Sequence, residues 1–162
     1  MNPSNAQVPP HGQPGGSGFS LVELLIAVTI LGALLAIAIP QFQSYRSDSM
    51  ISKAIGDLRI LDNQIKSYKM SNETFPAALN LVPQGNMLDP WGKQYQYLMI
   101  EGNAKATGQE RKDKNLVPIN SDFDLYSMGA DGMTAAALTS SKSQDDIVRA
   151  NDGSYFGLAS KY

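Results

Sequence analysis

The chain has 162 residues, a formal net charge of −2 and no cysteine. A weak negative charge gives no broad basic surface, which argues against nucleic-acid binding. The lack of cysteine excludes disulfides, thiolate metal sites and cysteine nucleophiles. The one histidine, His11, lies in a segment that we expect to be removed, so the remaining chain lacks the commonest general base. We therefore predict that the protein is not an enzyme.

Residues 1–18 are rich in Pro, Gly, Asn and Gln and carry no charge, a composition typical of disordered segments. Lys and Arg begin only after the apolar run that follows, at Arg46, Lys53 and Arg59. The positive-inside rule taken alone would keep the C-terminal side inside the cell. A classical secretory signal fits less well, because there is no basic n-region and no A-x-A-like cleavage site.

The run from Phe19 to Ile39 is almost wholly apolar and carries one charge, Glu23. As a helix it is about 30 Å long, enough to cross the hydrocarbon core of a bilayer. A carboxylate at the bilayer centre costs roughly 3 kcal/mol or more, so the presence of Glu23 in this run needs an explanation. Glu23 can compensate a cationic amine at Phe19, on its own chain or a neighbouring one. The alternative is a generic anchor whose acidic residue lies near the membrane interface.

The whole segment GFSLVELLIAVTILGALLAIAIP, from Gly18 to Pro40, resembles the start of class III signal proteins, the type IV pilins and pseudopilins. The resemblance implies that a prepilin peptidase cleaves after Gly18 and methylates the new N-terminus, Phe19. It also implies that Glu23 acts in filament assembly. The uncharged leader departs from this family, whose leaders usually carry Lys or Arg.

After Pro40 the apolar residues recur at spacings of three and four, which predicts an amphipathic helix. The positions of this stripe are Ile51, Ile55, Leu58, Leu61 or Asp62, Ile65 and Tyr68. We predict one long helix from about Ser20 to Met70, ended by Asn72 and Pro76 and kinked or loosened at Pro40. The alternative is two helices separated at Pro40.

The rest of the chain predicts a small β-sheet with turns between its strands. Turn residues occur at Thr74–Pro76 and Asp89–Gly92. Strands are predicted at 94–100, 116–119 and 123–129, and the tail around Tyr155-Phe156-Leu158 supplies a last strand or covers the sheet. The charged segment 101–115 reads as a solvated hairpin connection, and 134–144 has no function that the residues indicate. The fold class is then α+β, a pilin-like fold with one long helix, its first half transmembrane, packed on three or four antiparallel strands and a C-terminal loop region.

Two motifs narrow the resemblance to the major pseudopilins of type II secretion. Asp89-Pro90-Trp91-Gly92 followed by QYQY resembles the segment before their first strand, and Phe123–Gly132, FDLYSMGADG, resembles a later one. Trp91 is equally consistent with a core aromatic after a turn.

In that family the loop after the second motif binds one Ca²⁺, so the resemblance implies a calcium site. Ca²⁺ takes six to eight oxygens. The candidate ligands are the carboxylates of Asp131, Asp145 and Asp146, and the carbonyls of Leu125 and Ser127. Asp145 can instead cap a short helix over 145–150, and the acidic loop can simply be solvated.

The function predicted from the resemblance is that of a structural subunit of a type II secretion pseudopilus, polymerising through its N-terminal helix to drive protein export. The predicted parts are a cleaved leader (1–18), a transmembrane and filament-core helix (19–39) and a periplasmic head (40–162). Partners would be further copies, minor pseudopilins, the prepilin peptidase and an inner-membrane assembly platform. The alternatives are a surface or DNA-uptake pilin, and a single-pass membrane-anchored binding protein.

Overall fold

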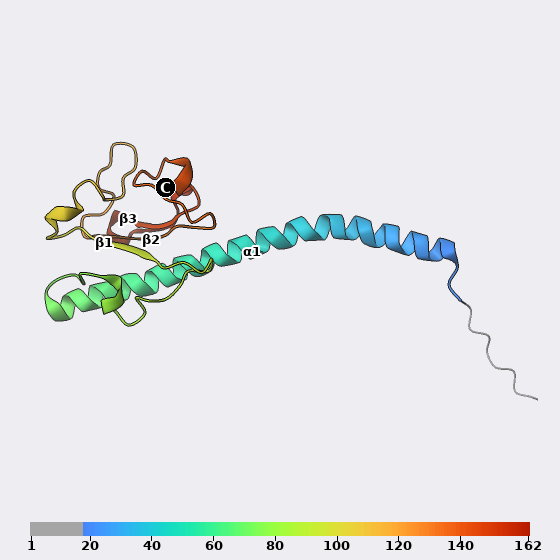
Figure 1. The fold of residues 1–162 in the computed structure, drawn as a ribbon, viewed down its shortest axis with the longest axis horizontal. Helices are drawn as coiled ribbons and strands as arrows, with labels where there is room; N and C mark the ends of the chain where they lie inside the picture. The colour runs from blue at the N-terminus through green and yellow to red at the C-terminus, as the bar shows by residue number, and fades with distance from the viewer. Residues whose placement is uncertain (1–17) are drawn as a thin grey trace, which may run out of the picture. The chain divides into compact units, whose positions relative to one another are not determined.

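The computed structural model describes residues 18–162, so the predicted disorder of the leader, and His11, lie outside the described residues. The chain forms two units, one up to Phe42 and one from Gln43 to Tyr162. We call the second unit the head. Figure 1 shows the helix that belongs to both units and the strands of the head.

The helix α1 runs from Leu21 to Asn72, close to the predicted bounds, and continues through Pro40. The alternative of two separate helices is therefore wrong. The helix ends where Glu73 adopts a positive φ of 63°, a backbone conformation that stops helices. The side-chain amide of Asn72 donates to the carbonyl of Tyr68, 2.9 Å away, and so satisfies one of the last free carbonyls.

Four short strands form one sheet with the order β1-β2-β3-β4, and every neighbouring pair is antiparallel. Short 3-10 turns lie between and after these elements. The strands are β1 (Gln96–Met99), β2 (Phe123–Ser127), β3 (Ile147–Ala150) and β4 (Tyr155–Leu158), and the turns are η1 (Leu79–Leu81), η2 (Ala104–Ala106), η3 (Ser141–Ser143), η4 (Asn151–Gly153) and η5 (Ala159–Lys161). The predicted α+β class, with a long helix and a small antiparallel sheet, is confirmed.

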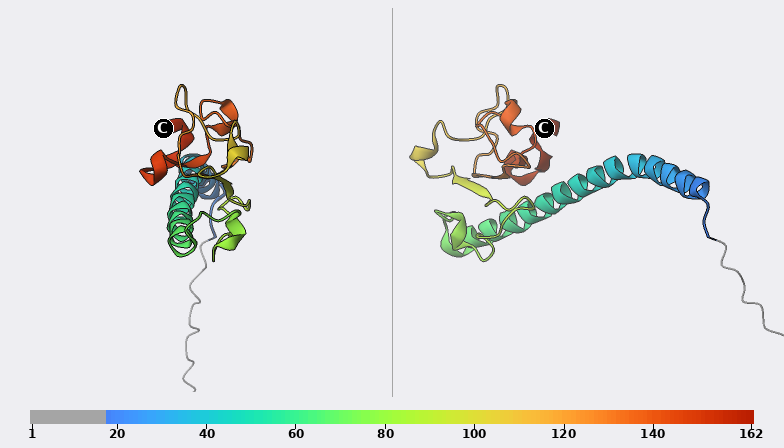
Figure 2. Two further views of the ribbon diagram at one scale, coloured as in Figure 1. Left: turned by 90° about the vertical axis from the view of Figure 1, so that its left-hand side faces the viewer. Right: turned by 45° about the vertical axis from the view of Figure 1, so that its right-hand side comes forward.

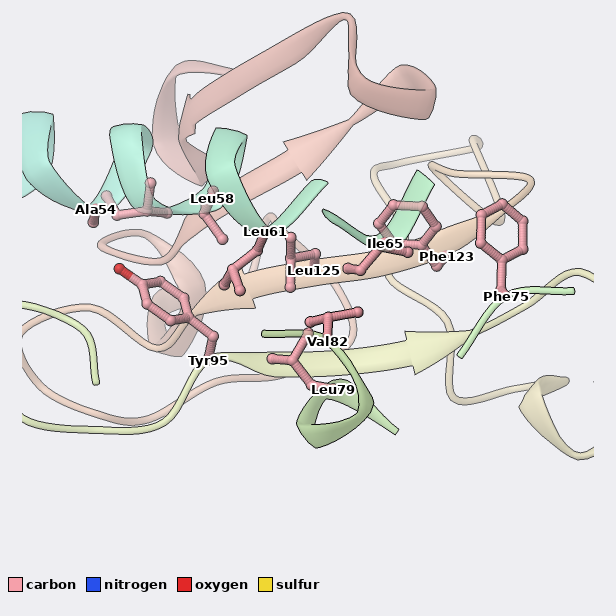
Figure 3. Close-up of a cluster of buried hydrophobic side chains, with 11 residues drawn as sticks. Ala54, Leu58, Leu61, Ile65, Phe75, Leu79, Val82, Tyr95, Phe123 and Leu125 are labelled. Carbon is pink, nitrogen blue, oxygen red and sulfur yellow. The ribbon is translucent and has the colours of Figure 1, made fainter. Parts of the chain in front are cut away.

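One face of the sheet packs on the second half of α1. Leu58, Leu61 and Ile65 are fully buried against Phe123 and Leu125 of β2. Figure 3 shows these side chains between the helix and the strands, with Phe75, Leu79, Val82 and Tyr95 closing the cluster. The apolar stripe predicted from the three- and four-residue spacing is thus the face that builds the main core.

The other face of the sheet is covered by the two long loops, residues 100–122 and 128–146, which we call the loop layer. Because side chains alternate along a strand, Ile147 points to the helix and Val148 points to the loops. Val148 and Ala150 form a second core with Ile119 and Leu138 of the loop layer. Figures 1 and 2 show the loops on the side of the strands away from α1.

Three local predictions are wrong. Residues 116–119 form no strand, because Ile119 turns into the second core while Leu116 and Val117 stay exposed. The segment 145–150 is not a helix, because Ile147–Ala150 pairs on both sides as β3. The connection 101–115 is not merely solvated, because Arg111 within it is buried.

Candidate functional site

The N-terminal junction contains a glycine for which the fold gives no reason. A Cβ placed on Gly18 would meet no atom of the described residues within 4 Å. Phe19, the next residue, is 87% exposed. Packing among the described residues therefore does not require Gly at position 18, and recognition by another molecule is a further reason for a glycine there.

Ser20 and Glu23 close the first turn of α1 in a reciprocal pair of hydrogen bonds. The backbone N–H of Ser20 donates to Glu23 Oε2 at 2.8 Å, and the N–H of Glu23 donates to Ser20 Oγ at 3.1 Å. This is a capping box, which satisfies two of the free donors at a helix N-terminus. The spacing S-x-x-E before an apolar run would have predicted it from the sequence. Glu23 thus has a structural partner in addition to the predicted amine of Phe19.

The first half of α1 exposes its apolar residues on every side. None of its most apolar 18-residue window is buried, and that window is long and apolar enough to cross a membrane. The exposed residues include Leu21, Leu24, Leu25, Ile30, Leu34 and Ile37. A helix that is apolar all round requires lipid or other helices around it.

The Asp89-Pro90-Trp91-Gly92 motif forms a turn held by its aspartate. Asp89 Oδ1 accepts the N–H groups of Trp91 (3.0 Å) and Lys93 (2.9 Å), and Gly92 has a φ of 85°. The other oxygen, Oδ2, accepts the Ser127 hydroxyl at 2.6 Å, and Ser127 Oγ accepts the N–H of Gly129 at 3.1 Å. The two sequence motifs are therefore parts of one hydrogen-bonded unit.

The residues predicted to bind calcium are near one another, but their side chains do not converge. Asp145 Oδ2 accepts the N–H of Asp131 at 3.0 Å, and Asp131 Oδ1 accepts the N–H of Met133 at 2.7 Å. Leu125 and Ser127, the predicted carbonyl ligands, lie within strand β2. Among residues 18–162, no three acidic or histidine side chains are grouped in a way that could hold a metal ion.

The third predicted ligand, Asp146, is fully buried and binds an arginine. Its Oδ2 lies 2.6 Å from Arg111 Nη2 and accepts the hydroxyl of Thr134 at 2.7 Å. Arg111 also donates to Thr134 and lies over the ring of Tyr126, 4.2 Å from its centroid. Burial raises the pKa of Asp146, although the hydrogen bonds from Thr134 and Arg111 act in the opposite direction.

The comparisons with known proteins agree with this arrangement. The family model described as the prokaryotic N-terminal methylation motif matches residues 16–39. The type II secretion system core protein G of Pseudomonas aeruginosa is 33% identical over 72% of this chain and 84% of its own length. This chain belongs to the type II secretion system core protein G family.

Two further relatives are also similar, one a core protein G and one a fimbrial protein. The core protein G of Vibrio cholerae is 29% identical over 72% of this chain and 82% of its own length. A fimbrial protein of Pseudomonas aeruginosa is 25% identical over 80% of this chain and 81% of its own length. No solved structure matches the chain significantly. The resemblance to pilins, and among them to the major pseudopilins, is confirmed.

Sequence reasoning missed the two buried arginines of this family member. Arg149 bridges Asp62 of α1 (2.6 Å from Nε) and Asp122 (2.6 Å from Nη2) while its guanidinium stacks on Phe123. Burial lowers the pKa of Arg149, but the two carboxylates outweigh it and the net pKa is raised. The sequence carried one signal for this clamp, the acidic Asp62 in the apolar stripe of the helix.

Proposed function

We propose that the chain is a structural, non-catalytic subunit of a type II secretion filament that polymerises through the first half of α1. The exposed apolar surface of residues 21–39 carries this proposal. Membership of the core protein G family supports the same role. The segment passes from the lipid of the inner membrane, which it spans once, to the helical core of a periplasmic filament of identical copies. The head stays on the periplasmic side and forms the outer surface.

Processing prepares the chain for assembly. A prepilin peptidase cleaves after Gly18 and methylates the amine of Phe19, and the match of residues 16–39 to the methylation motif supports this step. The new amine is cationic, and Glu23 lies four residues further along the same helix. It neutralises the amine of its own chain or of the adjacent subunit. An inner-membrane platform and minor pseudopilins then act in extraction and initiation.

The energetic role of Glu23 follows from the transfer of the helix out of lipid and into contact with neighbouring helices. Lipid tails are as apolar as leucine side chains, so exchanging lipid for neighbouring helices yields little hydrophobic free energy. An unpaired carboxylate or amine in the same medium is costly, whereas a pair is much less so. The pairing of Glu23 with an amine therefore favours one register of neighbouring helices over the others.

Intact mass and N-terminal sequencing of the protein from its own membranes, with and without the prepilin peptidase, test this function. We expect a chain that begins at methylated Phe19 only in the strain with the peptidase. A chain that retains residues 1–18 in both strains would refute the assembly mechanism and favour a membrane-anchored binding protein.

A surface pilin is the second candidate, because a fimbrial protein is 25% identical over 80% of the chain. The two filaments differ in what their loss removes. Deletion of the gene should abolish export of folded proteins if the chain serves secretion. It should leave export intact and abolish surface filaments if the chain is a pilin.

A further inference from the structure

We propose that the guanidinium of Arg111 is the resident cation of the loop layer, so that the head folds without a divalent metal ion. The proposal is independent of the filament function. It concerns the two loops for which the sequence indicated no role, and it disagrees with the calcium site that the family resemblance implied.

Arg111 is a buried charge that is paired with a buried carboxylate through its Nη2 atom, whereas its Nε has no hydrogen-bond partner among the described residues. It is 3% exposed, and its partner Asp146 is 0% exposed. The ion pair is 2.6 Å long and shares Thr134 as a hydrogen-bonding neighbour of both groups. The ring of Tyr126 covers the guanidinium face, a contact that stabilises a desolvated cation. Removing either charge would leave the other buried and unpaired.

The backbone holds Arg111 in this position. Its N–H donates to Asp124 Oδ2 at 2.6 Å, and its carbonyl accepts the N–H of Ile119 at 3.0 Å. The next residue, Lys112, joins the two loops, because its N–H donates to Ala136 and its carbonyl accepts from Leu138. The guanidinium therefore sits where the loop layer meets strand β2, as a fixed part of the fold.

Two of the carboxylate oxygens that a Ca²⁺ ion would need are already bonded to donors of the chain. Asp131 Oδ1 and Asp145 Oδ2 each accept a backbone N–H. A second cation, Lys93, crosses Gly132 so closely that a Cβ there would collide with its amine. A divalent ion placed at this loop would meet the like charges of Arg111 and Lys93. Calcium also needs six to eight oxygens, and no group of three acidic or histidine side chains among residues 18–162 is placed to supply them.

One buried carboxylate oxygen offers a calcium ion a place to bind, so the proposal can be tested by adding calcium. Asp146 Oδ1 is buried without a hydrogen-bond partner among the described residues. It is the atom at which a calcium ion would bind if the proposal is wrong. Binding there would compete with the Arg111 ion pair and would change the stability of the head.

The test is thermal unfolding of the full chain in detergent micelles, followed by the fluorescence of the single Trp, Trp91. We expect the same Tm in millimolar CaCl2 and in excess chelator. A bound ion at about 100 times its Kd would raise the Tm by roughly 5 °C or more. A calcium-dependent rise of that size in the unaltered protein would overturn the proposal.

The variant Arg111→Met removes the charge and keeps much of the side-chain volume. We expect its Tm to fall by about 10 °C, because it leaves Asp146 buried without its ion pair. Lys114→Met is the matched control, since Lys114 is 74% exposed and its ion pair is 3.5 Å long. If the Arg111 variant melts like the control, Arg111 is not the required cation. If Arg111→Met does not fold, Arg111→Lys provides the test, because it keeps the charge but lacks the planar guanidinium. We expect this variant to fold with a lower Tm that calcium leaves unchanged.

Discussion

The two halves of α1 use apolar residues in two different ways. In residues 21–39 they surround the helix and remain exposed, whereas between Ala54 and Ile65 they form one buried stripe. The chain's own sheet covers this stripe and buries it. The first half has no such partner among the described residues of the chain, so its stability depends on lipid or on other copies. One helix thus combines a folding surface with an assembly surface.

The acidic residues of the two halves of α1 also differ in their burial and in their partners. In the second half Asp57 and Asp62 lie within the buried stripe, and each has a partner in the head. Asp57 accepts the hydroxyl of Tyr95 at 2.9 Å, and Asp62 binds Arg149. In the first half the one charge, Glu23, is exposed and bonds only to the first turn of its own helix. The buried acids fix the second half of α1 to the rest of the head, and the exposed acid is available to another chain.

The largest effect should come from Glu23→Gln, which removes the charge and keeps the shape. We expect cleavage and membrane insertion to persist and polymers to disappear, because the partner amine would be buried unpaired. Chemical cross-linking ladders of membranes from cells that carry the variant measure this. Thr29→Val is the matched control, since the Thr29 hydroxyl bonds only to the carbonyl of Ile26 in the same helix. An unchanged ladder in the Glu23 variant would show that the charge does not direct assembly.

The next effect should come from Arg149→Met, which breaks the ionic clamp between α1 and the sheet. Asp62 and Asp122 would lose their buried partner, at a cost of about 3–5 kcal/mol in the free energy of unfolding. Chemical denaturation followed by Trp91 fluorescence measures it. Arg59→Met is the control, because Arg59 is exposed and lies over Phe156 at the surface. Equal losses in both variants would mean that the clamp contributes nothing beyond a surface cation.

A pair of Leu→Ala variants tests the comparison directly. Leu61 is 0% exposed in the stripe and Leu34 is 61% exposed in the first half. Leu61→Ala should cost the head about 2–5 kcal/mol through lost burial and a cavity. Leu34→Ala should change head unfolding by less than about 0.5 kcal/mol. A comparable loss in the Leu34 variant would mean that the two halves do not act separately.

The sequence predicted the parts of the fold that depend on local patterns. The spacing of Leu58, Leu61 and Ile65 predicted the buried face of α1, and Asp89 in its motif predicted a turn. It did not predict β3, because Ile147–Ala150 is buried on both faces and has no polar alternation to identify a strand.

The site was harder to predict because its contacts join distant segments. Arg111 and Asp146 are 35 residues apart, and Arg149 and Asp62 are 87 apart. No pattern within one segment indicates which acid an arginine will meet. Asp146 was therefore read by family resemblance as a metal ligand, whereas its packing gives it a guanidinium as partner. The resemblance at Gly18–Glu23 rests on consecutive residues instead, and the methylation-motif model matches the segment that contains them; the roles of Gly18, Phe19 and Glu23 stay predictions.

The smallest expected change in stability concerns the exposed contact between Asp152 and Ser121, in contrast to the buried ion pairs of Arg111 and Arg149. Asp152 accepts the N–H of Ser121 at 2.7 Å and its hydroxyl at 2.8 Å. Partial burial raises the pKa of Asp152, but these hydrogen bonds outweigh it and the net pKa lies below the ordinary 3.8. Stability from a lowered pKa is present above the unfolded value and is lost as the pH falls through the folded value. We expect Asp152→Asn to cost about 0.5–1 kcal/mol at neutral pH, discounted for its exposure.

Denaturation at a series of pH values measures this link. The difference between Asp152→Asn and the unaltered protein should shrink below about pH 4, where the native carboxylate also becomes protonated. Asp48→Asn, at an exposed position of α1, should show no such pH dependence. If the cost of Asp152→Asn instead stays constant on acidification, the contact to Ser121 depends on shape rather than on charge. The loop layer would then be held at this position by neutral hydrogen bonds, and its buried ionic contacts would be the pairs Arg111–Asp146 and Arg149–Asp122.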